Sequence, residues 1–161
     1  MENCLFCRIA AKQAPAYVVM EDSDFVAFLD IFPLIEGQTV VIPKKHFAGD
    51  GFDMPPAELS RLIVFTQKVS KALDSALGSE RCMMVLQGYS IDHAHTKLFP
   101  VKEVKTKTVD KDVYKKLVEI LKPNWYSGFI ISMSGKELES DEKLGELADK
   151  IRQKGQLANK E

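Results

Sequence analysis

The chain has 161 residues, of which 45% are hydrophobic and 28% are charged, and its formal net charge is −1. This length and composition predict one globular domain with a core of its own. A net charge so close to zero gives no bulk electrostatic attraction for nucleic acid or for an anionic membrane, so we expect neither as a partner.

The cysteines and the start of the chain bear on its location. Residues 1–4 contain no basic stretch followed by an apolar run, so we expect no secretory signal. No apolar stretch approaches the ~20 residues that cross a bilayer. Three cysteines are an odd number and too few for a disulfide scaffold. The sequence therefore predicts a reducing, cytoplasmic setting.

The first part of the chain predicts a short helix followed by strands. Residues 3–12 are typical of a short helix or turn, which Pro15 ends. Residues 17–21 and 25–29 are rich in aromatic and β-branched residues, and the turn-forming residues between them predict a hairpin. After a loop, the continuous apolar run 39–43 predicts a central strand.

The clearest predicted helix follows. Pro55-Pro56 opens it and Gly78 ends it. Its apolar residues recur at helical spacing: Leu59, Leu62, Ile63, Val69, Leu73 and Leu77. Residues 82–86 then predict a short strand.

The C-terminal part predicts further helices. Residues 113–121 indicate a helix and 129–133 a strand, and Ser140 is typical of the N-cap of a last helix. We therefore expect a single α+β domain over 1–161, with a mostly antiparallel sheet, a long helix and a C-terminal helical extension. Its core would span about 3–100, and 101–161 would form the extension.

Residues 87–100 hold two of the chain's three histidines and predict a strand that Gly88 opens and Pro100 ends. Successive side chains of a strand alternate between its faces. On a strand, His93, His95 and Lys97 would therefore point to one side. Such a pair of imidazoles could be exposed surface residues, metal ligands or a nucleophile with its neighbour.

Cys4 and Cys7 form a Cys-x-x-Cys pair, which is half of a common tetrahedral zinc site. Alone, this pair could also be two buried small hydrophobic residues or a redox pair. A zinc site needs two more ligands, and the imidazoles available are His46, His93 and His95. His46 follows two lysines and could simply be a surface residue.

Four segments together resemble the histidine-triad (HIT) family, in its usual order and spacing. Gly-x-x-Ile-x-His-Ala-His-x-Lys-Leu-Phe-Pro is similar to the triad motif His-φ-His-φ-His-φ-φ. The other three are Cys-Leu-Phe-Cys-Arg-Ile, Ala-Phe-Leu-Asp-Ile-x-Pro and Gly-Gln-Thr-Val-Val-Ile-Pro-Lys-Lys-His. The resemblance covers roughly residues 3–100 and points to a zinc-containing, bacterial-type branch with a variant triad.

The resemblance implies a HIT-like fold and a nucleotide hydrolase or nucleotidyl transferase. Substrates would be nucleoside phosphoramidates, dinucleoside polyphosphates or related conjugates. His95 would attack the α-phosphorus and form a nucleotidyl-histidine, with Lys97 beside it in the catalytic site. Asp30 would bind the ribose hydroxyls, and Gln38 and Gln87 would also contact the nucleotide. The base would lie among apolar residues: Leu5, Phe6, Ile9, Phe28 and Ile31.

The resemblance also implies a metal and a partner. Zinc would be held by Cys4, Cys7, His46 and His93. Four protein ligands leave no open position, so we expect a structural site. We expect a homodimer by analogy, with a contribution from the helix 56–77. Cys82 is interpreted as a core residue.

Two positions depart from the family pattern. Lys97 replaces the third histidine, and Gln38 occupies a position where many members have another histidine. Lys97 could still pair with a phosphate as a point charge. Asp92 stands where proline is common, and we expect its charge to repel phosphate. Three hypotheses follow: an active enzyme, a nucleotide-binding module without turnover, and a zinc-stabilised interaction protein.

Overall fold

The computed structural model describes residues 4–88, 90–102 and 138–158, and within these it shows one five-stranded antiparallel sheet. The strand order is β1-β2-β3-β5-β4. The strands are β1 Val18–Glu21, β2 Phe25–Leu29, β3 Thr39–Pro43, β4 Arg81–Gln87 and β5 His95–Val101. The α-helices are α1 Leu5–Ala10, α2 Pro56–Leu77 and α5 Asp141–Ala158, and Gly51–Asp53 forms a 3₁₀ turn. The predicted α+β fold is confirmed.

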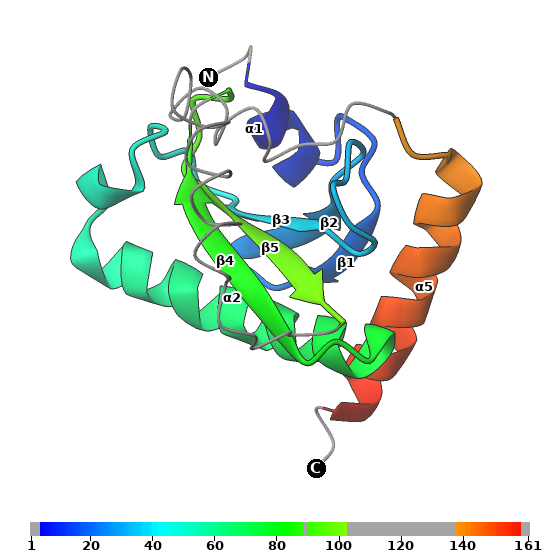
Figure 1. Ribbon diagram of the computed structural model, residues 1–161. Coiled ribbons are helices and arrows are strands. Elements are labelled where there is room, and N and C mark those ends of the chain that lie inside the picture. Colours follow the sequence, from blue (N-terminus) through cyan, green and yellow to red (C-terminus); the bar gives the residue numbers. More distant parts are fainter. Residues whose placement is uncertain (1–3, 89, 103–137, 159–161) are drawn as a thin grey trace, which may run out of the picture.

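Helices cover both faces of the sheet (Figure 1). On one face, α2 and α5 pack over alternate strand residues such as Ala27, Leu29 and Val41. On the other face, α1 packs over the intervening residues of the same strands. Every residue of β2 and β3 is consequently buried. The prediction that 39–43 is a central strand is confirmed, because β3 lies in the middle of the sheet.

The hairpin between β1 and β2 is closed by Asp22, one of the turn-forming residues between the two predicted strands. The Oδ1 atom of Asp22 accepts hydrogen bonds from the backbone N–H groups of Asp24 and Phe25, each at 2.8 Å. An aspartate that binds the backbone two and three residues on is a standard turn device. The predicted hairpin is therefore confirmed.

The long helix α2 has the ends that the sequence predicted. Pro56 occupies its first turn, where a missing N–H costs nothing. Gly78 caps its C-terminus with φ +67°, a conformation that glycine adopts without a steric penalty. Its buried face packs on the sheet and on α5.

The last helix, α5, joins the main core. Ser140 caps its N-terminus, because the Ser140 hydroxyl accepts the backbone N–H of Lys143 at 3.3 Å. The buried side chains of α5 lie against α2 and include Leu144, Leu147, Ala148 and Ile151. The Tyr17 hydroxyl also donates to Asp141 at 2.6 Å, which ties the start of α5 to the segment before β1. The predicted cap and helix are confirmed.

The prediction that the histidine stretch is one strand from Gly88 to Pro100 is wrong at its start. The strand β5 begins only at His95, and residues 91–93 form a bend. The backbone N–H of His93 donates to the carbonyl of Ile91 and that of Ala94 to the carbonyl of Phe47, so neither group pairs with β4. His93 therefore precedes the strand. The predicted helix 113–121 and strand 129–133 lie outside the described residues.

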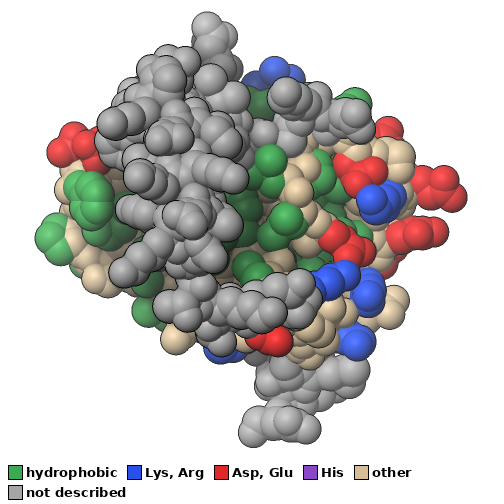
Figure 2. All heavy atoms as spheres, viewed as in Figure 1, with side chains coloured by type: hydrophobic (Ala, Val, Ile, Leu, Met, Phe, Trp, Pro, Cys, Tyr) green, Lys and Arg blue, Asp and Glu red, His purple; other side chains and the backbone are tan. Residues whose placement is uncertain are grey.

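The surface over α5 carries charges of both signs. Figure 2 shows acidic and basic side chains interspersed on the side of the molecule where α5 lies. None of the helices in the described part of the chain combines the length and the apolar character needed to cross a membrane.

Candidate functional site

His46 and His93 lie close together where two loops meet. His46 follows β3, and His93 lies in the loop between β4 and β5. The backbone N–H of Ala94 donates to the carbonyl of Phe47 at 3.0 Å, which holds the two loops together. The helix α1 lies on the same side of the sheet and brings Cys4 and Cys7 to the histidines.

Cys4, Cys7, His46 and His93 form one cluster, with their ligand atoms all within 4.8 Å of one another. The Sγ atom of Cys7 lies 3.3 Å from Nδ1 of His46 and 3.6 Å from Nδ1 of His93. The Sγ atom of Cys4 lies 3.5 Å from Nδ1 of His93. All four predicted ligands are therefore brought together.

These distances fit a tetrahedral metal. With Zn–S near about 2.3 Å and Zn–N near about 2.0 Å, sulfur and nitrogen ligands of one zinc ion lie about 3.5 Å apart. The three sulfur–nitrogen distances in the cluster, 3.3, 3.5 and 3.6 Å, match this expected ligand–ligand distance. Two thiolates with two imidazoles are also a common zinc donor set. These three separations and the donor set therefore fit zinc, and the remaining pairs of ligand atoms lie within 4.8 Å.

His93 is held in the protonation form that a ligand needs. Its Nε2–H donates to the carbonyl of Pro43 at 2.9 Å, so Nδ1 turns its lone pair toward the cysteines. The side chain is fully buried, and burial lowers its pKa, which favours the neutral ring. A backbone carbonyl on the second nitrogen is the usual way in which proteins orient a metal-binding imidazole.

His95 has the opposite orientation and stays out of the cluster. Its Nδ1–H donates to the carbonyl of His93 at 2.7 Å, which leaves the lone pair on Nε2. That Nε2 lies 3.3 Å from the side-chain nitrogen of Gln87, whose amide N–H it accepts. Phe6 packs edge-on against the ring, with centroids 5.1 Å apart. The imidazole is thus fixed, with its lone pair on Nε2.

The surroundings of His95 keep it uncharged. The side chain is 1% exposed, and burial, followed by the nearby charge of Lys97, lowers its pKa to about 4. At pH 7 the ring is therefore neutral and its Nε2 lone pair is available. Because Gln87 contacts that lone pair, a phosphorus atom reaches Nε2 only after the Gln87 amide moves aside.

The side chains of β5 alternate as predicted from His95 onward. Thr96 and Leu98 face α2, where the Thr96 hydroxyl meets that of Thr66 at 2.9 Å. His95 and Lys97 face the other way, and Lys97 donates to Asp30 at 2.8 Å. The strand therefore places the imidazole beside a buried ion pair.

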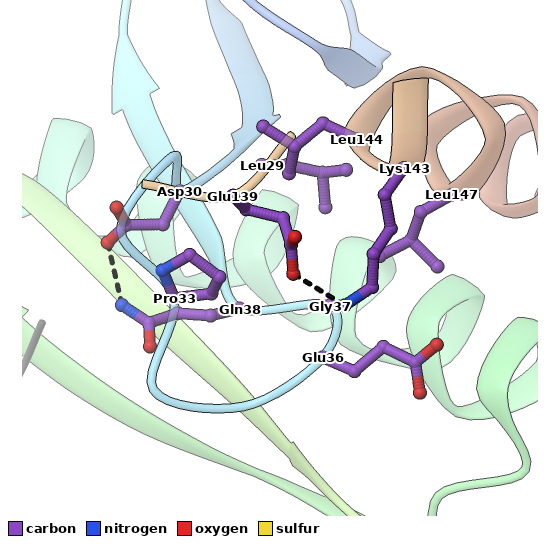
Figure 3. A pocket seen from close by; sticks show the side chains of 10 residues that line it. All are labelled: Leu29, Asp30, Pro33, Glu36, Gly37, Gln38, Glu139, Lys143, Leu144 and Leu147. Atoms are coloured by element: carbon purple, nitrogen blue, oxygen red, sulfur yellow. Dashed lines mark hydrogen bonds and ion pairs between the residues drawn. The ribbon is translucent and has the colours of Figure 1, made fainter. Parts of the chain in front are cut away.

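Asp30, Gln38 and Lys97 form one buried network. The Oδ2 atom of Asp30 accepts from Nε2 of Gln38 at 2.6 Å and from Nζ of Lys97 at 2.8 Å. Figure 3 shows the Gln38 side chain directed at the Asp30 carboxylate. The sequence analysis singled out all three residues but did not predict that they contact one another. Gln38 and Lys97, the two departures from the family pattern, both bind the Asp30 carboxylate.

The apolar residues expected around the base divide into two groups. Phe6, Ile9 and Phe28 are buried in one cluster on the α1 side of the sheet, and the rings of Phe6 and Phe28 meet at 5.6 Å. Leu5 and Ile31 are 45% and 43% exposed. The structure thus brings three of the five together and leaves two at the surface.

Two further residues gain a defined environment. The Asp92 carboxylate accepts the backbone N–H of Gly49 at 2.7 Å, a contact with no sequence signal. Cys82 lies on β4, where its thiol contacts Asp74 at 3.4 Å. Burial raises the pKa of that thiol to about 12, so it stays protonated. Cys82 is not part of the metal cluster.

A small hollow lies beside the network, between residues 29–38 and the start of α5 (Figure 3). Asp30 and Gln38 line one side, and Lys143, Leu144 and Leu147 line the other. His95 is not among the residues that line this hollow.

Comparison with known proteins identifies relatives. The model of the family described as HIT domain matches residues 11–119. An uncharacterized HIT-like protein of Methanocaldococcus jannaschii is 37% identical over 123 residues, covering 68% of this chain and 93% of the relative. The Cys4–Cys7 pair precedes the matched family segment.

Solved structures share the fold. A hypothetical histidine triad nucleotide-binding protein from Sulfolobus tokodaii superposes with a TM-score of 0.73 at 24% identity, covering 97% of this chain and 94% of that one. A zinc-bound histidine triad family protein from Mycobacterium smegmatis superposes with a TM-score of 0.70 at 24% identity, covering 99% of each chain.

Proposed function

The chain belongs to the HIT domain family, and on that premise we propose that it is a nucleotide hydrolase or nucleotidyl transferase that acts at the α-phosphate. The observation that carries the proposal is the tautomer of His95. Its Nδ1–H is held by the His93 carbonyl, so the neutral Nε2 carries the lone pair that a nucleophile needs. Substrates would be nucleoside phosphoramidates, dinucleoside polyphosphates or related conjugates.

The reaction would proceed in two displacements. In the first, the Nε2 lone pair of His95 bonds to the α-phosphorus while the bond to the leaving group breaks. The leaving group departs with the bonding electron pair and, where it is an amine, takes up a proton from solvent. In the second, an oxygen of water or another acceptor bonds to that phosphorus, Nε2 departs with its electron pair, and the acceptor's proton passes to solvent. The buried Nδ1–H···O=C bond would hold the ring through both steps.

The proposed metal is zinc at Cys4, Cys7, His46 and His93, in a structural role. When bound, zinc would fix the two loops and α1 relative to one another. Free cysteines are typical of reducing compartments, so the three free cysteines support a cytoplasmic location as part of the proposal. Homodimerisation remains a prediction, and sedimentation velocity of the purified chain would measure it.

The test of the enzyme is a trapped intermediate. The purified protein is mixed with an adenosine phosphoramidate or a diadenosine polyphosphate, quenched and examined by intact-protein mass spectrometry. We expect one nucleotidyl group on the wild type and none on His95→Ala, together with product release by the wild type alone. Equal inertness of wild type and variant on a broad nucleotide panel would contradict the proposal.

A nucleotide-binding module without turnover is the second candidate. The observation that favours it is the near-complete burial of His95 with the Gln87 amide on its Nε2. Calorimetry with AMP and GMP separates this candidate from a zinc-stabilised interaction protein. Binding heat without any nucleotidyl intermediate supports the module, and the absence of both heat and thermal shift supports the interaction protein.

A further inference from the structure

The carboxylate of Asp30 is already occupied by protein donors. Its Oδ2 atom receives Gln38 and Lys97, at 2.6 and 2.8 Å, and its Oδ1 atom receives the backbone N–H of Phe32 at 3.0 Å. Asp30 and Lys97 are 9% and 8% exposed at their side chains, so this ion pair is shielded from water. A shielded, charge-assisted contact is costly to break.

The Gln38 amide is fixed in the orientation that serves Asp30. Its Oε1 accepts the backbone N–H of Leu34 at 2.8 Å, which leaves the amide N–H₂ turned to the carboxylate. The side chain is fully buried. Turning the amide over would set its oxygen against the carboxylate and leave the Leu34 N–H without its acceptor, so the arrangement is self-consistent.

The carboxylate therefore has little accepting capacity left. An ionised carboxylate offers about four lone-pair positions. Both positions on Oδ2 are taken by side chains, and one position on Oδ1 is taken by the Phe32 N–H. One position remains, on Oδ1. A ribose presents two neighbouring hydroxyls, and a carboxylate receives both only when it has two positions to give.

We propose that Gln38 and Lys97 restrict Asp30 to one sugar hydroxyl, so that the site accepts nucleotides that lack the other ribose hydroxyl. The inference rests on the proposed function and on the expectation, implied by the family resemblance, that Asp30 binds the ribose hydroxyls. Gln38 and Lys97 are then positioning and specificity residues, which act on the sugar through the carboxylate. The two departures from the histidine-triad pattern thereby have one shared role.

The test compares three ligands that need no turnover. The affinities of AMP, 2′-deoxy-AMP and 3′-deoxy-AMP are measured by calorimetry, with the matching guanine series in parallel. A hydrogen bond to a charged group is worth about tenfold or more in affinity. We expect one deoxynucleotide to bind about tenfold more weakly than the ribonucleotide, and the other to bind within about twofold of it.

Other results overturn the inference in distinguishable ways. Comparable losses for both deoxynucleotides would show that Asp30 receives two hydroxyls. No loss for either would show that it receives none. Failure of every nucleotide in both series to bind would remove the proposed nucleotide site as well, whereas the first two results leave that site standing.

A substitution tests the cause. Gln38→Met removes the amide at nearly constant volume and frees one position on Oδ2, so the tolerated deoxynucleotide should become disfavoured by about threefold or more. Gln67→Met is the matched control, because Gln67 is exposed on α2, outside the proposed nucleotide site, and the affinity ratio should not move. An unchanged ratio in folded Gln38→Met contradicts the inference. If Gln38→Met does not fold, the comparison of the three ligands on the wild type still tests whether Asp30 binds a single sugar hydroxyl.

Discussion

At the scale of single residues, the ion pair between Asp30 and Lys97 stands apart from the other pairs in the described part of the chain. Both of its side chains are less than a tenth exposed. The other described pairs involve at least one side chain that solvent screens more strongly. Exposed pairs contribute little to stability, whereas loss of one partner from a buried pair leaves an uncompensated charge. This pair is therefore where a single charge substitution has the greatest effect.

We expect Lys97→Met to lower the free energy of unfolding by about 3 kcal/mol or more, because it strands the Asp30 carboxylate. Asp30→Asn should also destabilise the protein, since it removes the carboxylate charge that lies 2.8 Å from the Lys97 ammonium. The double variant Asp30→Asn/Lys97→Met should lose less than the sum of the two single losses. Denaturant unfolding at pH 7 measures all three, and additive losses would argue against a coupled pair.

Residue chemistry is visible in the sequence, but residue partners are often not. The two cysteines and His46 and His93 could be proposed as ligands, because those residue types suit zinc and the family resemblance fixed which histidine joins them. The contact between Asp30 and Lys97 spans 67 positions along the chain. Neither residue type indicates the other as its partner, so only the fold reveals the network.

Among the elements, the loops after β3 and before β5 depend on each other. They carry His46 and His93, and the Gly49 N–H donates to Asp92 across them at 2.7 Å. A Cβ atom added to Gly88 would lie 1.9 Å from the Gly49 carbonyl oxygen, closer than any real contact. The obstacle is backbone, so one of the loops must shift.

We therefore expect Gly88→Ala to weaken zinc binding by about tenfold or more, because it separates the two histidine ligands. Competition with a chromophoric chelator measures the affinity, and Cys7→Ser marks the loss of a direct ligand. Gly145→Ala on α5 is the matched control, since its added Cβ meets nothing within 4 Å and should leave zinc affinity unchanged. Wild-type zinc affinity in Gly88→Ala would refute this account of the loops.

The elements themselves were largely predictable. Turn residues, the helical spacing of α2 and the Ser140 cap are local signals, and each gave the correct element. The start of β5 was not predictable, because the backbone N–H of Ala94 is taken by the carbonyl of Phe47, a residue far away in the sequence. The packing of α5 against α2 was also not predictable, since an amphipathic pattern does not name the surface it covers.

In the molecule as a whole, α5 completes the core that α2 and the sheet begin. Leu144 is 2% exposed within this core. Leu138 lies just before the helix and is 64% exposed. The two leucines therefore offer a matched pair for measuring how much the helix contributes.

We expect Leu144→Ala to lower the free energy of unfolding by about 3 kcal/mol, because it removes buried methyl groups and leaves a cavity. Leu138→Ala should change it by less than about 0.5 kcal/mol, as exposed substitutions usually do. Thermal and denaturant unfolding measure both. Similar small effects from both substitutions would mean that α5 is not an integral part of the fold.

The complete burial of β2 and β3 also determines which positions of this sequence can accept polar substitutions. A strand covered on one side tolerates polar changes at every second position, but these two strands have no such positions. On β4, by contrast, Met83 and Met84 are 56% and 46% exposed. Random mutagenesis with selection for folding should therefore deplete polar variants at the ten positions of β2 and β3, 25–29 and 39–43. Polar variants should accumulate instead along β4, at the edge of the sheet.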